Sequence, residues 1–170
     1  MTLLVQYTLV FSSVLLLVAL GGCFSEHSGI INIGLEGIMV VGALGGALAM
    51  RFLPASVGTF GIVSLSILSA VILGSLYSLL LAVAAINFKA DQTLVGTALN
   101  LLGVAASTVI VKAMNTSMDP NNVSSTIQYI AAKKAFLVNI RGFEFNWFML
   151  LAVVALAIAY VLLYKTRFGL

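Results

Sequence analysis

Two polar side chains, Asn32 and Glu36, interrupt an apolar part of the chain in the segment SGIINIGLEG. A charged side chain inside a bilayer costs about 2.5–3.5 kcal/mol, so such residues face the interior of a helix bundle or a wet cavity. Residues four positions apart share one face of a helix, and we therefore expect Asn32 and Glu36 to lie together. Their types and spacing fit three roles: contact with a hydrophilic solute, a gate or hinge, or capping of a helix that pairs with a neighbouring helix.

Glycines surround this pair and continue beyond it. Gly29, Gly34 and Gly37 allow the backbone to bend, to unwind or to be approached closely. A break in a membrane helix is tolerated only where protein or water satisfies the freed backbone groups. Gly42 and Gly46 form a G-x-x-x-G face that lets another helix approach closely. We expect all five glycines to act as packing or hinge positions.

A second polar group lies in the segment ADQTLVGTALNLLG. Asp91 and Gln92 precede a predicted helix and are typical of its cap. Asn100 follows about 12 Å further along that helix, at 1.5 Å per residue. A buried asparagine in a membrane helix more often bonds to a neighbouring helix than to a ligand. Gln92 and Asn100 nevertheless join Asn32 and Glu36 as candidates for the path of a polar solute.

The sequence carries no recognisable catalytic or metal-binding motif. Cys23 is the single cysteine and His27 the single histidine, which excludes an internal disulfide and leaves too few ligands for a zinc site. We find no Ser/His/Asp set, no paired acids on one helix and no phosphate-binding loop with its lysine. We therefore predict neither an enzyme nor a cofactor or metal bound by this chain, and we interpret His27 as an ordinary turn residue rather than a pH sensor.

The composition indicates a chain that lies in lipid. Of the 170 residues, 62% are hydrophobic and 8% are charged, whereas a soluble domain carries about 25% charged residues. Five apolar stretches approach or exceed the roughly 20 residues that a helix needs to cross a membrane. They run over residues 3–21, 30–50, 60–86, 93–111 and 147–164. The predicted fold class is all-α, a polytopic transmembrane helical bundle with about five membrane helices in a single domain over residues 1–170.

The long connection and the distribution of charge bear on how the chain is oriented in the membrane, and the charges favour neither orientation consistently. The longest connection spans residues 112–146, and its later part, STIQYIAAKKAFLV, fits a short amphipathic helix. Lys165 and Arg167 beside the end of the fifth helix favour a cytoplasmic carboxyl end. That orientation places three basic residues inside and five outside, a balance that favours the opposite orientation. The net charge of +3 is small and does not indicate a nucleic-acid partner.

Three blocks of the sequence resemble permease subunits of ATP-binding-cassette importers, in the branch that serves simple sugars and nucleosides. The blocks are FSEHSGIINIGLEGIMVVGALGGALA, ADQTLVGTALNLLG and YKTRFGL. They occur in the expected order over residues 24–170, and the first is the most specific. Such permeases continue past TRFGL into a coupling segment and a second set of helices. The resemblance therefore implies that this chain is roughly the amino-terminal half of a permease.

The resemblance also implies partners and a place in the cell. A second permease subunit, two cytoplasmic subunits that bind ATP and Mg, and an extracytoplasmic solute-binding lipoprotein would complete the importer. The permease would be a multi-pass protein of the plasma (inner) membrane of a prokaryote. Lys165 and Arg167 would lie inside, and the connection over residues 112–146 would lie outside.

The implied function is passage of a simple sugar or nucleoside by alternating access, driven by the partner ATPases. Asn32, Glu36, Asn100 and Gln92 would offer polar contacts, because a solute hydroxyl left unpaired in a dry cavity costs about 1–3 kcal/mol. One alternative is a permease for branched-chain amino acids. Another is a membrane scaffold that assembles other subunits without transporting. A channel is disfavoured, because the sequence contains no ring-forming acidic motif.

Overall fold

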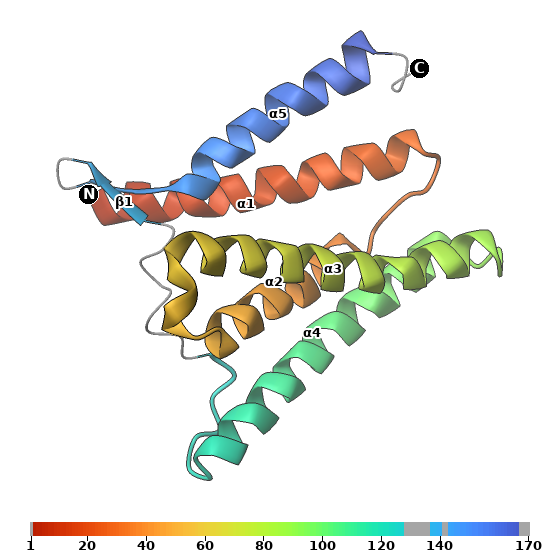
Figure 1. Cartoon of the computed structure of the whole chain (residues 1–170). Helices are drawn as coiled ribbons and strands as arrows, with labels where there is room; N and C mark the ends of the chain where they lie inside the picture. The colour runs from red at the N-terminus through yellow and green to blue at the C-terminus, as the bar shows by residue number, and fades with distance from the viewer. Residues whose placement is uncertain (1, 128–136, 141–142, 167–170) are drawn as a thin grey trace. The chain divides into compact units, whose positions relative to one another are not determined.

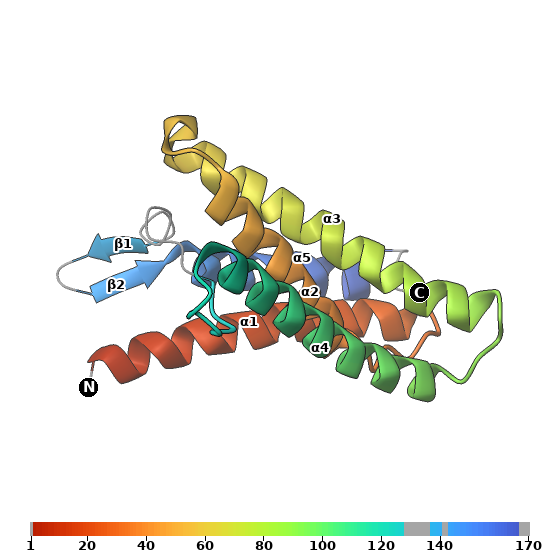
Figure 2. The ribbon, with the colours of Figure 1, turned by 90° about the horizontal axis from the view of Figure 1, so that it is seen from below.

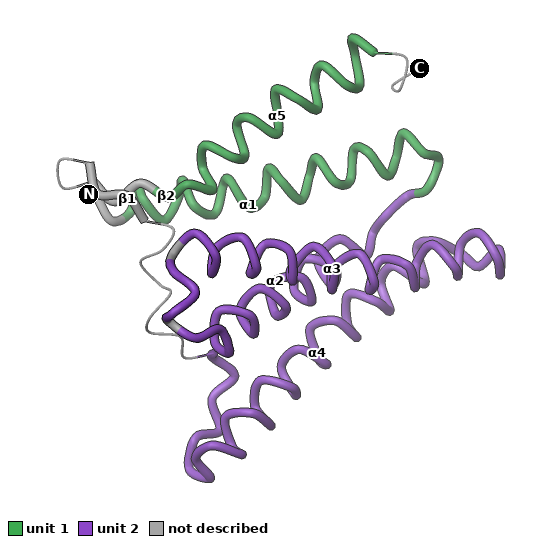
Figure 3. Tube along the Cα trace, viewed as in Figure 1, with its two compact units in different colours: residues 1–30, 136–170 green, residues 31–135 purple. Residues whose placement is uncertain are grey.

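The computed structural model describes residues 2–127, 137–140 and 143–166. Five helices in these ranges are long and apolar enough to cross a membrane, which confirms the predicted all-α class (Figure 1). The elements are α1 (Thr2–His27), α2 (Leu35–Phe52), a short 3-10 helix (Ala55–Val57), α3 (Gly58–Ile86), α4 (Gln92–Met118), β1 (Leu137–Ile140), β2 (Phe143–Asn146) and α5 (Trp147–Lys165). Contacts divide the chain into two compact units, residues 1–30 with 136–170 and residues 31–135 (Figure 3).

In the first unit, α1 packs against α5, and the two strands form an antiparallel hairpin. The register pairs Leu137 with Asn146 and Ile140 with Phe143. Asn146 also begins α5, because its side-chain oxygen accepts a hydrogen bond from the Phe148 N–H at 3.0 Å. Large apolar side chains are exposed along both helices, as expected of helices in contact with lipid or other membrane helices.

In the second unit, α2 lies between α3 and α4 (Figure 2). The face of α4 that is turned inward carries one buried residue per turn. These residues are Gly96, Leu99, Gly103, Ser107, Val111 and Asn115. Spacings of three and four residues define a single stripe on a helix, and half of the members of this stripe are glycine or serine. Small side chains let membrane helices approach until their backbones touch.

Glycines of α2 also face α3. A Cβ atom added to Gly42 would lie 3.3 Å from the carbonyl oxygen of Ala70, and one added to Gly46 would lie 3.4 Å from that of Ser66. Gly45, which the sequence analysis did not select, is more crowded, because its added Cβ would lie 2.7 Å from the Leu73 side chain. The Ser69 hydroxyl donates a hydrogen bond to the carbonyl of Gly45 at 3.0 Å. One face of α2 is therefore fitted to α3 along its length.

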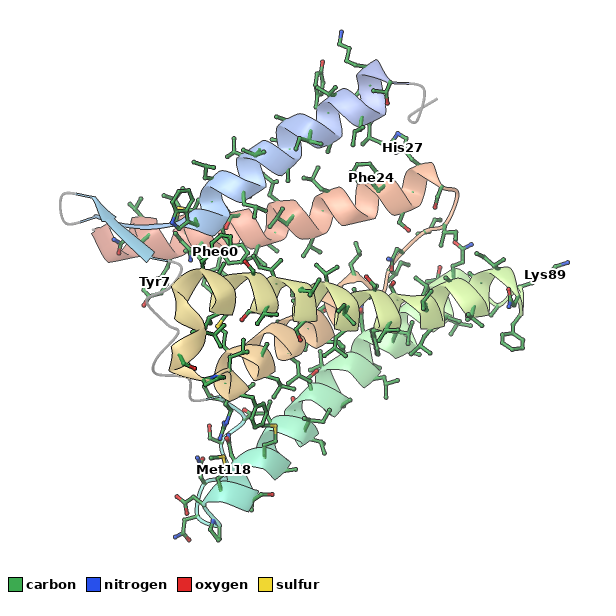
Figure 4. The ribbon with its side chains drawn as sticks, in the orientation of Figure 1. Tyr7, Phe24, His27, Phe60, Lys89 and Met118 are labelled. Carbon is green, nitrogen blue, oxygen red and sulfur yellow. The ribbon has the colours of Figure 1, made fainter. Side chains whose placement is uncertain are left out.

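Turn chemistry fixes the ends of α3. The chain leaves α2 through Leu53, whose extended backbone (φ −71, ψ 128) is the conformation favoured before a proline such as Pro54. Gly58 begins α3 with φ +74. At the other end, Lys89 has a positive φ of 51, and its side chain extends from the turn between α3 and α4 (Figure 4).

The helix boundaries differ from those expected from the apolar stretches. Helix α2 begins at Leu35 rather than at residue 30, and α1 continues to His27. Helix α4 continues to Met118, so that Lys112 is helical and the following connection starts at residue 119. The polar residues at these ends belong to the helices, because their side chains bond locally: Ser117 Oγ, for example, donates to the Ala113 carbonyl at 2.7 Å.

The β-hairpin was not predicted. The amphipathic helix expected over residues 125–138 is wrong at its carboxyl end, where Leu137 and Val138 belong to β1. Residues 128–136 of that expected helix lie outside the described residues. The strand signal in the sequence is the alternation of apolar and polar residues in FEFN, two residues after LVNI.

Candidate functional site

Most of the polar segment SGIINIGLEG lies in a non-helical stretch before α2. Residues 28–34 separate α1 from α2, and Gly29 has a left-handed φ of +83 that favours glycine. Asn32 lies in this break, whereas Glu36 lies in the first turn of α2. The expectation that Asn32 and Glu36 share one face of a helix is therefore wrong, because the helix begins between them.

Two side chains of α4 hold the broken segment. The Gln92 side-chain oxygen accepts a hydrogen bond from the Ile31 N–H at 2.8 Å. The Asn100 oxygen accepts one from the Gly37 N–H at 2.7 Å, and the Asn100 amide nitrogen donates to the Ile33 carbonyl at 2.8 Å. A break in a membrane helix requires partners of this kind for its backbone groups. Gln92 and Asn100 thus provide them from the neighbouring helix.

Backbone contacts between α2 and α4 occur at the same level. A Cβ atom added to Gly37 would lie 2.6 Å from the Leu99 carbonyl oxygen, and one added to Gly96 would lie 3.0 Å from the Gly34 nitrogen. The Tyr77 hydroxyl of α3 donates to the same Leu99 carbonyl at 2.6 Å. Three helices therefore meet at Leu99, directly beside Asn100. Gly29, by contrast, has open space around it.

The other two candidate residues have polar groups that the described residues do not engage. The side-chain oxygen of Asn32 is buried and has no hydrogen-bond partner there. Glu36 is exposed on the first turn of α2, where a carboxylate interacts favourably with the helix dipole. Of the four candidates, Gln92 and Asn100 use their side-chain amides in hydrogen bonds to backbone groups of residues 31–37. The buried Asn32 oxygen has no hydrogen-bond partner among the described residues, and Glu36 is exposed.

A further polar cluster, which the sequence analysis did not select, lies at the opposite end of α2 and α4. Asn115 is 2% exposed, and its oxygen accepts a hydrogen bond from Arg51 Nη1 at 3.2 Å. Its amide nitrogen donates to the carbonyls of Ser124 and Thr126, each at 2.9 Å. Arg51 Nη2 also contacts the sulfur of Met118, at the end of α4 (Figure 4).

Spacing is the signal that would have found this cluster. Asn100 and Asn115 are about four helical turns apart and thus share a face of α4. Each uses its amide to bind backbone from another segment: Asn100 at the start of α2, and Asn115 in the connection after α4. Helices α2 and α4 run in the same chain direction. Polar contacts join them at both ends, and glycine contacts lie between these.

Comparison with known proteins agrees with this architecture. The family described as branched-chain amino acid transport system / permease component matches residues 4–170, and the chain belongs to it. No solved structure matches this chain.

Two curated relatives cover nearly the whole chain. The guanosine ABC transporter permease protein NupQ of Bacillus subtilis is 37% identical over 174 residues, which cover 100% of this chain and 54% of the relative. The nucleoside ABC transporter permease protein NupC of Lactococcus lactis is 34% identical over 180 residues, covering 99% of this chain and 54% of the relative. The chain thus spans about half the length of these relatives. The resemblance to permeases of ATP-binding-cassette importers is confirmed, and the chain is a multi-pass protein of the plasma membrane.

Proposed function

We propose that this chain forms part of the translocation pathway of an ATP-binding-cassette importer for nucleosides or related sugars. The observation that carries the proposal is the break before α2: Asn32 lies in it with a buried oxygen that has no partner among the described residues, and Glu36 is exposed on the first turn that follows. The amide and carboxylate offer hydrogen bonds to ribose hydroxyls or to base N–H groups. The names of the two relatives support nucleosides as the solute class.

Transport follows from alternating access around this break. Ordered irregular backbone that lines a cavity is a common binding site in transporters. The partners in this proposal are a second permease subunit, two cytoplasmic subunits that hydrolyse ATP with Mg, and an extracytoplasmic solute-binding lipoprotein. Glu36 and Asn32 would contact the solute, while Gln92 and Asn100 support the backbone that carries them.

Uptake by the assembled transporter in proteoliposomes tests the proposal. ATP-dependent uptake of labelled guanosine is expected, with competition by other nucleosides and none by leucine. The family description names branched-chain amino acids, so uptake of leucine instead of guanosine would favour that alternative. Uptake of neither solute, from a transporter whose ATPase is active and that has its binding protein, would favour a scaffold.

Substitutions of two exposed glutamates, Glu36 and Glu26, test whether Glu36 lies in the solute path. Glu36→Gln keeps the shape of the side chain and removes its charge, and we expect nucleoside uptake to fall about tenfold or more, the range for a lost charge-assisted hydrogen bond. Glu26→Gln is the control, because Glu26 is exposed at the end of α1. Equal uptake by the two variants would remove Glu36 from the solute path.

A further inference from the structure

Helix α2 begins without a capping side chain of its own. The N-cap residue is Gly34, and no side chain caps the helix locally. Helix α3 of the same unit also begins without a side-chain cap, at Val57, whereas α4 is capped locally, because Asp91 accepts hydrogen bonds from the N–H groups of Thr93 and Leu94 at 2.8 and 3.2 Å. The first N–H groups of any helix lack partners within the helix. At the start of α2, one of these N–H groups, that of Gly37, finds its partner on another helix.

Asn100 is that partner. Its side-chain oxygen accepts from the Gly37 N–H at 2.7 Å, and its nitrogen donates to the Ile33 carbonyl at 2.8 Å. An asparagine amide offers both an acceptor and donors, and here each is used on the backbone on one side of the helix start. A carboxylate would supply only the acceptor, and an alkyl side chain neither.

The contact also needs Gly37. An asparagine side chain is short, so its amide reaches the α2 backbone only where the two helices nearly touch. A Cβ atom added to Gly37 would lie 3.0 Å from the Asn100 Cα atom, tighter than ordinary van der Waals contact. Gly37 and Asn100 therefore form a matched pair across the helix crossing.

We infer that Asn100 is a positioning residue for the solute site: it caps α2 from α4 and thereby fixes Asn32 and Glu36 on either side of the helix start. It does so with the amide groups that a solute would otherwise use. The consequence for transport rests on the proposed function, whereas the consequence for the backbone does not. Loss of Asn100 should weaken transport of every solute by a similar factor, because the site itself is displaced.

Hydrogen exchange of the purified transporter tests the backbone part. Asn100→Ala should accelerate exchange in peptides that cover residues 28–38 by about tenfold, the factor for one net hydrogen bond. Exchange in the second half of α4 should not change. Thr97→Ala is the control, because Thr97 is exposed on the same helix and bonds only to its own turn through the Thr93 carbonyl. Unchanged exchange over residues 28–38 in Asn100→Ala would overturn the inference.

Solute comparison tests the role in the site. Uptake of guanosine, deoxyguanosine and inosine should fall by the same factor in Asn100→Ala, with their ratios preserved. A change in these ratios without faster exchange would show direct contact with solute and overturn the inference. Asn100→Asp keeps an acceptor for the Gly37 N–H but sets a second acceptor oxygen against the Ile33 carbonyl, so exchange over residues 28–38 should be faster and uptake lower than in the wild type. This variant also carries the test if the alanine variant does not accumulate. If the wild type takes up no nucleoside, the proposed function fails, while the exchange experiment still decides the capping role.

Discussion

Gly37 and Gly103 meet backbone to backbone where α2 crosses α4. A Cβ atom added to Gly103 would lie 2.9 Å from both the Cα atom and the carbonyl oxygen of Gly37. Real Cβ atoms do not approach backbone this closely, so one of the two helices would have to move to make room for the methyl group of an alanine at position 103. Moving α4 away would also withdraw Asn100 from the Gly37 N–H.

Substitution of Gly103 by alanine should therefore destabilise the second unit. We expect a loss of about 1–3 kcal/mol, the range for overpacked sites, measured as a lower midpoint of thermal unfolding in detergent. Gly21→Ala is the control, since an added Cβ there has nothing within 4 Å and alanine favours a helix. A Gly103→Ala protein as stable as the Gly21→Ala protein would contradict the crossing.

Asn115→Ala should loosen the start of the connection after α4. The substitution leaves the carbonyls of Ser124 and Thr126 without this donor and removes the acceptor for Arg51. Such losses cost about 1–3 kcal/mol at a buried site. Limited proteolysis should cut residues 119–127 faster in this variant.

Asn121→Ala is the matched control for Asn115, because its contribution to the loop comes from its backbone N–H, which donates to Asp119 at 3.0 Å. A double-mutant cycle with Arg51→Met then isolates the contact between Arg51 and Asn115. Coupling of about 0.5 kcal/mol or more is expected for residues in one hydrogen-bond network. Strict additivity, or equal cleavage of the two asparagine variants, would count against this cluster.

Tyr77→Phe should weaken the junction of three helices at Leu99. The phenol donates to the Leu99 carbonyl at 2.6 Å, and removing a single hydroxyl hydrogen bond costs about 0.5–1.5 kcal/mol. Thermal unfolding in detergent measures the change. Tyr7→Phe provides the comparison, because Tyr7 is 61% exposed on α1 (Figure 4). Equal midpoints for the two variants would mean that the Tyr77 bond adds nothing to stability.

The five membrane helices follow from composition, because long apolar runs have few alternatives in lipid. The ends of these helices do not follow from composition, because a helix can continue into polar residues whose side chains form hydrogen bonds within it. In α4, the Ser117 hydroxyl donates to the Ala113 carbonyl in this way. The hairpin was missed because the first two residues of LVNI end a segment that also fits the period of a helix.

The sequence identified the polar residues of the site by their types, but it did not predict the hydrogen bonds that they form. Nothing local to Asn100 indicates that its amide reaches Gly37 and Ile33, which lie 63 and 67 positions away. That contact exists only once two helices have crossed at glycine. Asn32 and Glu36 were expected on one helix face, and the sequence alone did not show that the helix would start between them.

The separation of 63 positions between Gly37 and Asn100 has a consequence for synthesis of the protein. Ribosomes add about 5–20 residues per second, so the start of α2 is made about 3–13 s before the residue that caps it. Until Asn100 has been made, the Gly37 N–H lacks this acceptor. Folding of the start of α2 therefore finishes only when α4 arrives beside it, which makes the order of helix insertion part of how this site is built.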